Sequence, residues 1–349
     1  MVKIPIAAST PYEVTLGHSD SWMSNVSYWK DRSAIWVVTD ETVNRLHGEA
    51  FHSQLHRFAE QIVWSVVEPG DGSKSLQTIE RLVEQGLREG CDRHTLIIAF
   101  GGGMVGDLAG FLASVFMRGV PYIQVPTTVL AHDSAVGGKV AVNHPLAKNA
   151  IGAFYQPLGV HYNVSRLETL TPLEVRSGLG ELIKHAYLSR HVLESSFEVD
   201  LFKALESEMD WVTWLAKGID VKRTVVEQDE REQGIRAWLN FGHTFGHALE
   251  SVETYRLPHG EAILYGMVFA FLLSGDVQRA ASLKKWMDEQ DVTPVDWKPF
   301  DAYLEKMTHD KKNRKGVIRF VLLRDEVVIE PVQIDRLQAT FEKMKEWWT

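Results

Sequence analysis

Residues 95–100 form a short apolar run that stops at Gly101-Gly-Gly-Met-Val-Gly106, and a stretch with helical spacing, residues 105–116, begins inside this turn. A strand, a glycine turn and a helix in this order are typical of a nucleotide site. Glycine lets the backbone approach a pyrophosphate, and the start of the helix offers N–H donors. The acidic residue expected about 20 residues later, which would hold a ribose, is missing. A tight strand-to-helix turn therefore explains the pattern equally well.

Two other short apolar runs, residues 34–39 and 122–125, are predicted to be buried strands, and residues 75–89 have helical spacing. Strands that alternate with helices predict a parallel sheet covered on both faces. Asp40 follows the first of these runs, and Thr127 and Thr128 follow the third. Ligands bind at the carboxyl edge of such sheets, so these polar residues together with the glycine turn favour a nucleotide.

The second half of the chain is mainly helical. Helical segments are expected near residues 173–188, 211–226, 244–252 and 261–273, and a β-like run covers residues 317–323. The change of pattern falls within residues 157–170. We therefore expect an α/β nucleotide-binding domain with a parallel sheet in residues 1–160, and a mainly α-helical metal-binding domain in residues 161–349.

Histidines and carboxylates of this second half have the spacing of a metal site. His243, His247 and Glu250 are four and seven residues apart, so a helix presents them on one face. Three nitrogen and oxygen ligands beside an open position describe a catalytic zinc site. Spacing alone leaves several ligand sets open, and a polar helix start or a solvated ion pair would also explain these residues. The candidates are Glu181, His185, His243, His247 and His259.

A polar segment, residues 133–149, is dense in hydrogen-bond donors among glycines and small residues. It suits a loop that wraps a small anion, with donors from Lys139, Asn143, Lys148 and Asn149. A second basic set consists of Lys222, Arg236, Lys311 and Lys312, although runs such as the last pair are usually solvated.

Composition excludes several classes of partner. The formal net charge of -9 argues against a nucleic-acid partner, which would favour a basic face. The single cysteine, Cys91, fits a reducing compartment. The first ten residues lack the pattern of a secretion signal, and no apolar run approaches the roughly 18 residues of a membrane span. We therefore expect a cytoplasmic protein without a membrane partner.

Taken together, these motifs resemble the 3-dehydroquinate synthase family of sugar phosphate cyclases, from about residue 40 to residue 323. The match is strongest in residues 101–107, 133–157 and 239–250, and its most diagnostic segment is residues 137–145 with residues 148–157. The resemblance implies an active site in the cleft between the two domains. It implies NAD as cofactor and Zn²⁺ or Co²⁺ on Glu181, His243 and His259. It makes His247 a contact of the substrate and its phosphate, and it removes His185 from the ligand set.

The resemblance also implies contacts for both small molecules and for a partner subunit. Arg118 matches an arginine that reaches the neighbouring site, which implies a homodimer. Some positions depart from the family pattern, among them Thr42, Asp71 and Ala147, and they affect the adenosine contacts rather than the reaction. The implied NAD contacts are Asp40, Asp71, Lys74, Gly102, Gly103, Asp107, Thr127, Thr128 and Lys148, with Thr169, Leu170 and Glu174 nearby. The implied catalytic and substrate contacts are Asp133, Lys139, Asn149, Lys184, Lys222, Arg236, Asn240 and His247, with one or both of Lys311 and Lys312.

The implied activity is that of a carbon–oxygen lyase in the shikimate pathway of aromatic amino acid biosynthesis. Its sugar phosphate substrate, 3-deoxy-D-arabino-heptulosonate 7-phosphate, becomes 3-dehydroquinate and phosphate through transient oxidation by NAD, elimination of phosphate, reduction and aldol cyclisation. Another sugar phosphate cyclase is one alternative. An NAD- and metal-dependent polyol dehydrogenase is a second, although it would lack the phosphate-binding lysines. A nucleotide-binding sensor without turnover is a third, and the metal candidates beside many cations argue against it.

Overall fold

The computed structural model describes residues 1–254, 256–309 and 317–348, and the chain forms two compact units. The first, called the sheet unit, comprises Met1–Leu170 and Asp210–Arg231. The second, called the helical unit, comprises Thr171–Met209 and Glu232–Thr349. The sequence led us to expect one boundary after residue 160, whereas the chain passes between the units three times.

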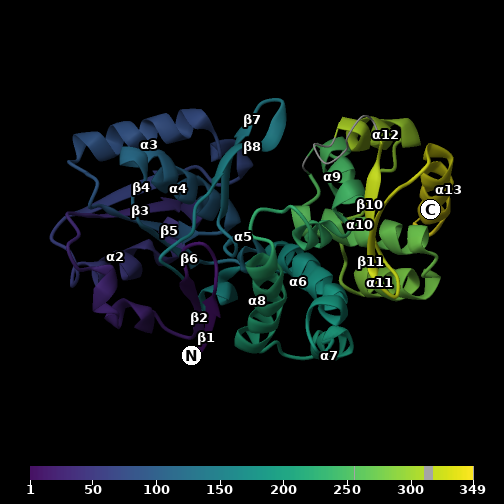
Figure 1. The fold of residues 1–349 in the computed structure, drawn as a ribbon, viewed down its shortest axis with the longest axis horizontal. Helices are drawn as coiled ribbons and strands as arrows, with labels where there is room; N and C mark the ends of the chain where they lie inside the picture. The colour runs from purple at the N-terminus through teal and green to yellow at the C-terminus, as the bar shows by residue number, and fades with distance from the viewer. Residues whose placement is uncertain (255, 310–316, 349) are drawn as a thin grey trace. The chain divides into compact units, whose positions relative to one another are not determined.

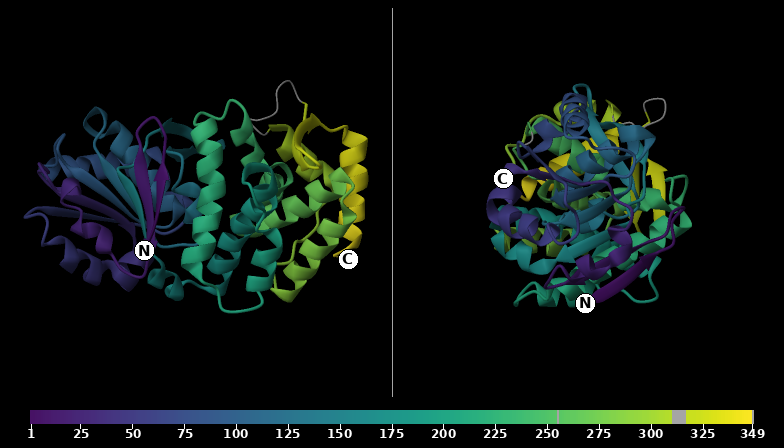
Figure 2. Two further views of the ribbon diagram at one scale, coloured as in Figure 1. Left: turned by 60° about the horizontal axis from the view of Figure 1, so that its bottom comes forward. Right: turned by 90° about the vertical axis from the view of Figure 1, so that its left-hand side faces the viewer.

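The sheet unit is built on a seven-stranded sheet with the strand order β1-β2-β9-β6-β5-β3-β4 (Figures 1 and 2). Neighbours are parallel from β2 to β4, and β1 alone pairs antiparallel, with β2. The predicted parallel sheet is confirmed. The strands are β1 (Val2–Ile6), β2 (Tyr12–Gly17), β3 (Ile35–Asp40), β4 (Ile62–Val67), β5 (Leu96–Gly101), β6 (Tyr122–Pro126) and β9 (Gly159–Asn163).

Alternating side chains of the central strands enter two different cores. Trp36 and Val38 of β3 pack in one cluster with side chains of α3 (Leu76–Arg88) and α4 (Gly103–Val115). Ile35 and Val37 belong to another, which contains side chains of α2 (Glu49–Leu55). Figure 1 shows these helices on opposite faces of the sheet. Burial on both faces explains why residues 34–39 are an apolar run without polar alternation. The short α1 (Glu41–Val43) and the π-helical turn Asn44–Gly48 connect β3 to α2.

Helix α8 (Trp211–Gln228) belongs to the sheet unit although the chain enters the helical unit before it. Its Leu215 and Ile219 pack in a third cluster with Val14, Val160 and other side chains of β1, β2 and β9. The sequence predicted this helix but assigned it to the second domain. Helical periodicity identifies an apolar face and does not identify the surface that the face covers.

Residues 139–154 form a hairpin of β7 (Lys139–His144) and β8 (Ala147–Phe154), so the expectation of a loop was wrong there. Val140 and Val142 of β7 are buried in the cluster that contains α4. This alternation of buried valines with polar residues is a strand pattern that the glycines and lysines around it obscured. The short helix α5 (Ala131–Ser134) lies just before the hairpin.

The helical unit is arranged around α10 (His259–Ser274), which is buried from Gly260 to Leu273 (Figure 1). A helix that is apolar all round must be covered on every side, and its neighbours include α6, α9, α11 and α13. The other elements are α6 (Pro172–Val192), α7 (Glu198–Ala204), α9 (His243–Val252), α11 (Val277–Glu289), α12 (Phe300–His309), α13 (Ile334–Glu346), β10 (Arg319–Leu323) and β11 (Val327–Pro331).

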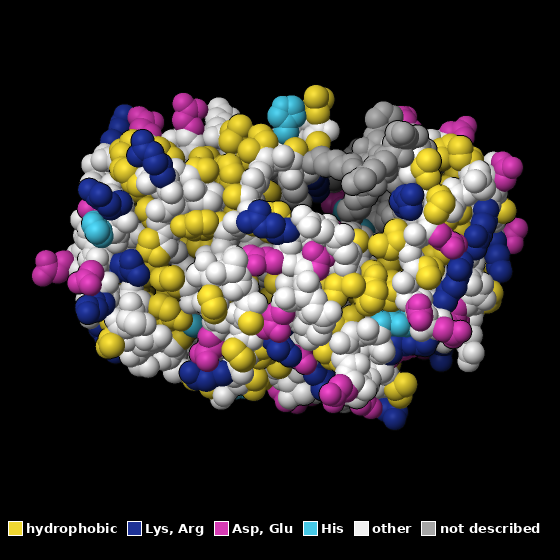
Figure 3. All heavy atoms as spheres, in the orientation of Figure 1, with side chains coloured by type: hydrophobic (Ala, Val, Ile, Leu, Met, Phe, Trp, Pro, Cys, Tyr) yellow, Lys and Arg dark blue, Asp and Glu magenta, His cyan; other side chains and the backbone are white. Residues whose placement is uncertain are grey.

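The exposed surface carries charges of both signs. Figure 3 shows Lys and Arg side chains interspersed with Asp and Glu side chains on one face. Within the described part of the chain, no helix combines the length and the apolar character that crossing a membrane requires.

A buried histidine joins three elements of the sheet unit. The Nδ1 atom of His161 on β9 lies 2.8 Å from Thr15 Oγ1 on β2, and its Nε2 atom lies 3.1 Å from Tyr28 Oη. The ring stacks on Trp22 at a centroid distance of 4.6 Å. Burial, helped by the positive charge of Lys3, lowers the pKa of His161 to about 3. The native sheet unit therefore holds this imidazole neutral.

We expect this histidine to make folding stability depend on pH. Between about pH 6.5 and about pH 3 the unfolded chain binds a proton at His161 that the folded chain does not. Stability should fall as the pH falls through this range, with a slope of up to about 1.4 kcal/mol per pH unit from this one group. Chemical denaturation followed by tryptophan fluorescence should show a flatter profile in His161→Gln than in the wild type. Identical slopes in both proteins would contradict the assignment.

Candidate nucleotide edge and metal centre

The polar residues predicted to hold a nucleotide gather at one edge of the sheet. Strand β3 ends at Asp40, β5 at Gly101 and β6 at Pro126, and the register pairs Thr39 with Phe100 and Gly101 with Pro126. Since these strands are parallel, the three carboxyl ends are adjacent. The loop after β6 adds Thr127 and Thr128 to the same edge.

The glycine turn is required for close packing rather than for unusual backbone angles. A Cβ atom on Gly102 would lie 3.0 Å from Thr128 Cγ2, and one on Gly103 would lie 2.8 Å from Ser134 Oγ. Helix α4 begins at Gly103, and no side chain in the described residues caps it. The first N–H groups of α4 are therefore suited to an anion such as a pyrophosphate.

Three buried hydroxyl groups lie at this edge. The Oγ1 atoms of Thr39, Thr127 and Thr128 are buried and have no hydrogen-bond partner within the described part of the chain. Buried polar atoms are normally paired, so such atoms at a sheet edge are suited to a ligand. Asp40 also has a local role, because its Oδ1 accepts hydrogen bonds from the backbone N–H groups of Thr42 and Val43 at the start of α1.

A charged cluster joins the loop after β4 to α4 and to the β7–β8 hairpin. The Nζ atom of Lys74 lies 2.5 Å from Asp107 Oδ2 and 2.5 Å from Asn149 Oδ1. Lys148 Nζ lies 2.8 Å from Asp71 Oδ2. Burial raises the pKa of Asp107, and Lys74 opposes that change. The structure thus brings together four predicted NAD contacts and one predicted substrate contact.

Two more predicted substrate contacts pair in the sheet unit. Lys222 of α8 lies with its Nζ 3.1 Å from Asp133 Oδ1 and also donates a hydrogen bond to the Asp133 carbonyl oxygen. Lys222 is buried, and Asp133 is half-buried on α5. Lys139 begins β7 and is exposed. The packing of α8 on the sheet unit is therefore what places Lys222.

In the helical unit, two histidines from different helices direct the same nitrogen at one carboxylate. Nε2 of His243 on α9 lies 3.5 Å from Glu181 Oε1, and Nε2 of His259 on α10 lies 3.2 Å from the same oxygen. Glu181 on α6 is almost fully buried. Two imidazole nitrogens and a carboxylate oxygen are a donor set that suits Zn²⁺ or Co²⁺.

The remaining candidates of the helical unit surround this group. Lys184 Nζ lies 2.5 Å from Glu181 Oε2, one turn along α6, and is buried. The ring centroid of His247 lies 5.1 Å from the ring centroid of His243 and 5.7 Å from that of His259. Arg236 is 1% exposed, and the Nδ2 of Asn240 donates to Glu232 Oε1 at 2.9 Å.

Two carboxylates determine the charge state of His259. Burial lowers the pKa of His259, but hydrogen bonds to Glu181 and Glu250 outweigh it and raise the pKa to about 10. A cation between these carboxylates is therefore strongly favoured. A divalent metal ion held by these residues would supply such a positive charge.

Close contact between α6 and α10 holds Glu181 beside His259. A Cβ atom on Gly180 would lie 2.1 Å from the Gly260 carbonyl oxygen, and one on Gly260 would lie 1.7 Å from the Ser177 carbonyl oxygen. The Gly260 N–H donates to Ser177 Oγ at 3.1 Å. These glycines escaped the sequence analysis because nothing in their spacing distinguishes a helix contact from a turn.

The remaining predicted residues have other contacts or positions. Thr169 Oγ1 lies 3.0 Å from His47 Nε2, and Leu170 follows it. Glu174 forms a capping box with Thr171 at the start of α6. His185 is buried on the same helix and offers a nitrogen within 4.8 Å of a Glu181 oxygen. Arg118 is exposed with a positive φ of 68°. Lys311 and Lys312 lie outside the described residues.

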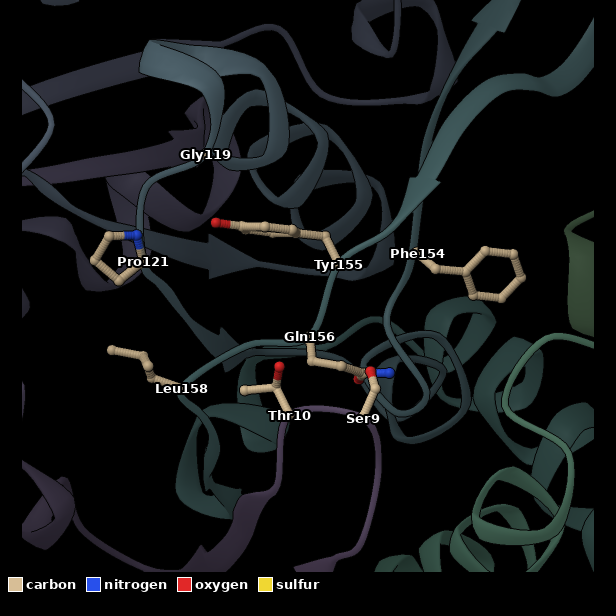
Figure 4. A pocket seen from close by; sticks show the side chains of 8 residues that line it. All are labelled: Ser9, Thr10, Gly119, Pro121, Phe154, Tyr155, Gln156 and Leu158. Carbon is tan, nitrogen blue, oxygen red and sulfur yellow. The ribbon is translucent and has the colours of Figure 1, made fainter.

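A separate pocket of about 350 Å³ opens in the sheet unit (Figure 4). Its lining includes the side chains of Tyr155 and Gln156 and the loop residue Gly119. Gln156 Nε2 and Ser9 Oγ both donate to Glu230 Oε1, each at 2.7 Å. None of the predicted site residues lines this pocket.

Comparison with known proteins gives one consistent family. The family model described as 3-dehydroquinate synthase N-terminal matches residues 64–177, and the model described as 3-dehydroquinate synthase C-terminal matches residues 178–313. A 3-dehydroquinate synthase from Exiguobacterium sp. is 70% identical over 350 residues, which cover 100% of this chain and 99% of that protein. One from Listeria monocytogenes is 43% identical over 323 residues, with coverages of 89% and 88%.

Solved structures share the fold. A 2-deoxy-scyllo-inosose synthase in complex with carbaglucose-6-phosphate, NAD+ and Co²⁺ has a TM-score of 0.86 at 25% identity, with coverages of 98% and 99%. A 2-epi-5-epi-valiolone synthase from Streptomyces hygroscopicus, with NAD+ and Zn²⁺ bound, has a TM-score of 0.83 at 23% identity, with coverages of 96% and 97%. An iron-containing alcohol dehydrogenase has a TM-score of 0.69 at 14% identity, with coverages of 97% and 98%.

We expect the α6–α10 contact to control the metal centre. In Gly180→Ala the added methyl group must push the Gly260 backbone away, which should cost at least about 1–3 kcal/mol and move Glu181 from His259. Thermal unfolding and Zn²⁺ titration should therefore show lower stability and weaker binding. Gly72→Ala is the control, because a Cβ atom there meets nothing within 4 Å. A Gly180→Ala protein that matches the wild type in both measurements would refute this account.

Proposed function

The chain belongs to the 3-dehydroquinate synthase family, and we propose that it catalyses the reaction of that family with NAD and a divalent metal ion. The substrate is 3-deoxy-D-arabino-heptulosonate 7-phosphate, and the products are 3-dehydroquinate and phosphate. The reaction makes the protein a carbon–oxygen lyase of aromatic amino acid biosynthesis. The observation that carries the proposal is the convergence of the His243 and His259 Nε2 atoms on the buried carboxylate of Glu181.

NAD is assigned to the carboxyl edge of the sheet. The uncapped start of α4 suits the pyrophosphate, and the buried hydroxyls of Thr39, Thr127 and Thr128 suit the ribose and phosphate oxygens. The cluster of Lys74, Asp107, Lys148 and Asp71 supplies further donors and acceptors. Solved cyclases of the same fold contain NAD+, which supports this assignment. The proposed NAD contacts also include Asp40, Gly102, Gly103, Thr169, Leu170 and Glu174.

The metal is assigned to Glu181, His243 and His259, and either Zn²⁺ or Co²⁺ fits these donors. When bound, NAD supplies a reversible oxidation of the substrate and the metal supplies Lewis acidity. Lys184 balances the charge of Glu181 beside the metal. His247 is one helical turn from His243 and is proposed to contact the substrate rather than the metal.

The chain's own side chains bind the two anionic ends of the substrate. Arg236 is held rigid by its burial, and its planar fork matches the two oxygens of a carboxylate. With Lys139 it is proposed to select a carboxylate-bearing substrate. Lys222 is held by Asp133 and offers an ammonium group in the sheet unit. The proposed substrate contacts also include Asn149, Lys184 and Asn240. This excess of cations over bases suits a reaction in which phosphate leaves.

A homodimer and a cytoplasmic location are part of the same proposal. Met117, Arg118 and Gly119 have consecutive positive φ angles of 49°, 68° and 114°, which fix the loop that carries the exposed Arg118. Such a loop suits an arginine that serves a neighbouring subunit. The one cysteine, Cys91, is free and buried, as suits a reducing compartment.

The alternatives differ from this proposal in their substrates. Alcohol and glycerol dehydrogenases share the fold at TM-scores of 0.69 and 0.65, and at 14% and 16% identity they show the fold alone. The 2-deoxy-scyllo-inosose synthase of the same fold is in complex with carbaglucose-6-phosphate, a phosphate without a carboxylate. The buried Arg236 and the identity of 70% to a 3-dehydroquinate synthase favour the proposed reaction over both.

We expect catalytic rather than stoichiometric use of NAD. With the heptulosonate phosphate, Zn²⁺ and a small amount of NAD, many equivalents of phosphate should be released without accumulation of NADH absorbance. Chelation should stop phosphate release, and Zn²⁺ or Co²⁺ should restore it. NADH formed in step with substrate consumption would instead identify a dehydrogenase, and full activity of metal-free His243→Ala would exclude the metal assignment.

We expect Arg236→Ala to lower kcat/KM for the heptulosonate phosphate by about ten- to a hundred-fold. A hydrogen bond to a charged group contributes roughly 1.5–3 kcal/mol, which corresponds to that loss. Arg223→Ala is the matched control, because this arginine of α8 pairs with Asp220 and Glu227 on the surface of its own helix. Glucose 6-phosphate should not be a substrate. An unimpaired Arg236→Ala, or a preference for glucose 6-phosphate, would refute recognition of a carboxylate.

A further inference from the structure

The two proposed histidine ligands differ in what holds their second nitrogen. Nδ1 of His243 lies 3.1 Å from the backbone carbonyl oxygen of Phe241. Nδ1 of His259 lies 3.3 Å from Oε2 of Glu250. One imidazole is therefore oriented by a neutral acceptor on its own chain segment, and the other by a carboxylate on a different helix.

Glu250 is built into this position. It lies on α9 seven residues after His243, so the same helix that carries one histidine ligand also carries the carboxylate that contacts the other. Glu250 is 7% exposed, and a carboxylate with so little access to water must be compensated by specific partners. An ionised carboxylate only accepts hydrogen bonds, so Nδ1 of His259 is the donor. The opposite nitrogen, Nε2, is the one that faces Glu181.

We propose that Glu250 is a positioning residue for the metal, acting through His259. This inference rests on the proposed ligand set of Glu181, His243 and His259. By accepting the Nδ1–H, Glu250 fixes the ring orientation and the tautomer that presents Nε2 to the metal. Its negative charge also makes Nε2 of His259 a stronger electron-pair donor to the metal. The neutral carbonyl group beside His243 has a smaller effect on that histidine. The two histidines are thus unequal ligands.

Two substitutions separate the effects of orientation and charge. Glu250→Gln keeps an oxygen that accepts the Nδ1–H and removes the charge, whereas Glu250→Ala removes both. Partners of this kind typically change metal affinity by about 10- to 100-fold. We expect the Zn²⁺ dissociation constant, measured by competition with a chromophoric chelator, to rise about ten-fold in Glu250→Gln and towards a hundred-fold in Glu250→Ala. Excess Zn²⁺ should restore phosphate release in Glu250→Gln.

Controls make each outcome decisive. Glu253→Gln alters a buried carboxylate at the end of the same helix that bonds Arg256 and the Asp296 N–H, and it should bind Zn²⁺ as the wild type does. His243→Ala should lose Zn²⁺ binding.

If Glu250→Gln and Glu250→Ala bind Zn²⁺ normally while His243→Ala does not, the role of Glu250 is refuted and the ligand set stands. If His243→Ala binds normally, the ligand set fails. If Glu253→Gln loses as much Zn²⁺ affinity as Glu250→Gln, the loss reflects any buried carboxylate of this helix and the proposal is overturned. The proposal is also overturned if Glu253→Gln and Glu250→Gln lower the unfolding temperature of the metal-free protein equally, because the change is then one of general stability.

Discussion

The buried carboxylate of Glu181 is the constraint on which the helical unit depends. A charge taken out of water costs several kcal/mol unless partners compensate it, and Lys184, His243 and His259 all lie within 3.5 Å of its oxygens. These partners come from three helices, α6, α9 and α10. The packing of those helices is therefore tied to the chemistry of one side chain, and the apolar α10 provides the rigid support.

The sheet unit differs from the helical unit because its polar groups gather at one edge of a sheet, where the buried Lys74 is paired with Asp107. Its strands bury apolar side chains on both faces, which leaves only the strand ends for polar groups. Gly102 and Gly103 let α4 begin close to Thr128 and Ser134. Small residues at this point keep the helix start and the hydroxyl groups within reach of the same ligand.

Much of this arrangement was accessible from the sequence. The strand–glycine–helix unit predicts both the parallel sheet and the position of the nucleotide edge, since local pattern and register agree there. The proposed ligand set could not be chosen from spacing, because His185 and His247 are as well spaced as His259. Packing is what places Glu181 beside His259, because Gly180 and Gly260 bring α10 against α6, and His185 also offers a nitrogen within 4.8 Å of a Glu181 oxygen. Contacts between helices have no local sequence signature.

The position of Lys222 shows why topology matters to the chemistry. Asp133 and Lys222 are 89 residues apart, and no periodicity connects them. Because the apolar face of α8 packs on β1 and β2, Lys222 is fixed to the sheet unit, although α8 lies between two segments of the helical unit. Lys222 is therefore held with Asp133 in the sheet unit, whereas Glu181, His243 and His259 belong to the helical unit. The hydrophobic contact of Leu215 and Ile219 therefore determines to which unit this cation belongs, and a polar substitution there would displace Lys222 without altering any of the proposed substrate contacts.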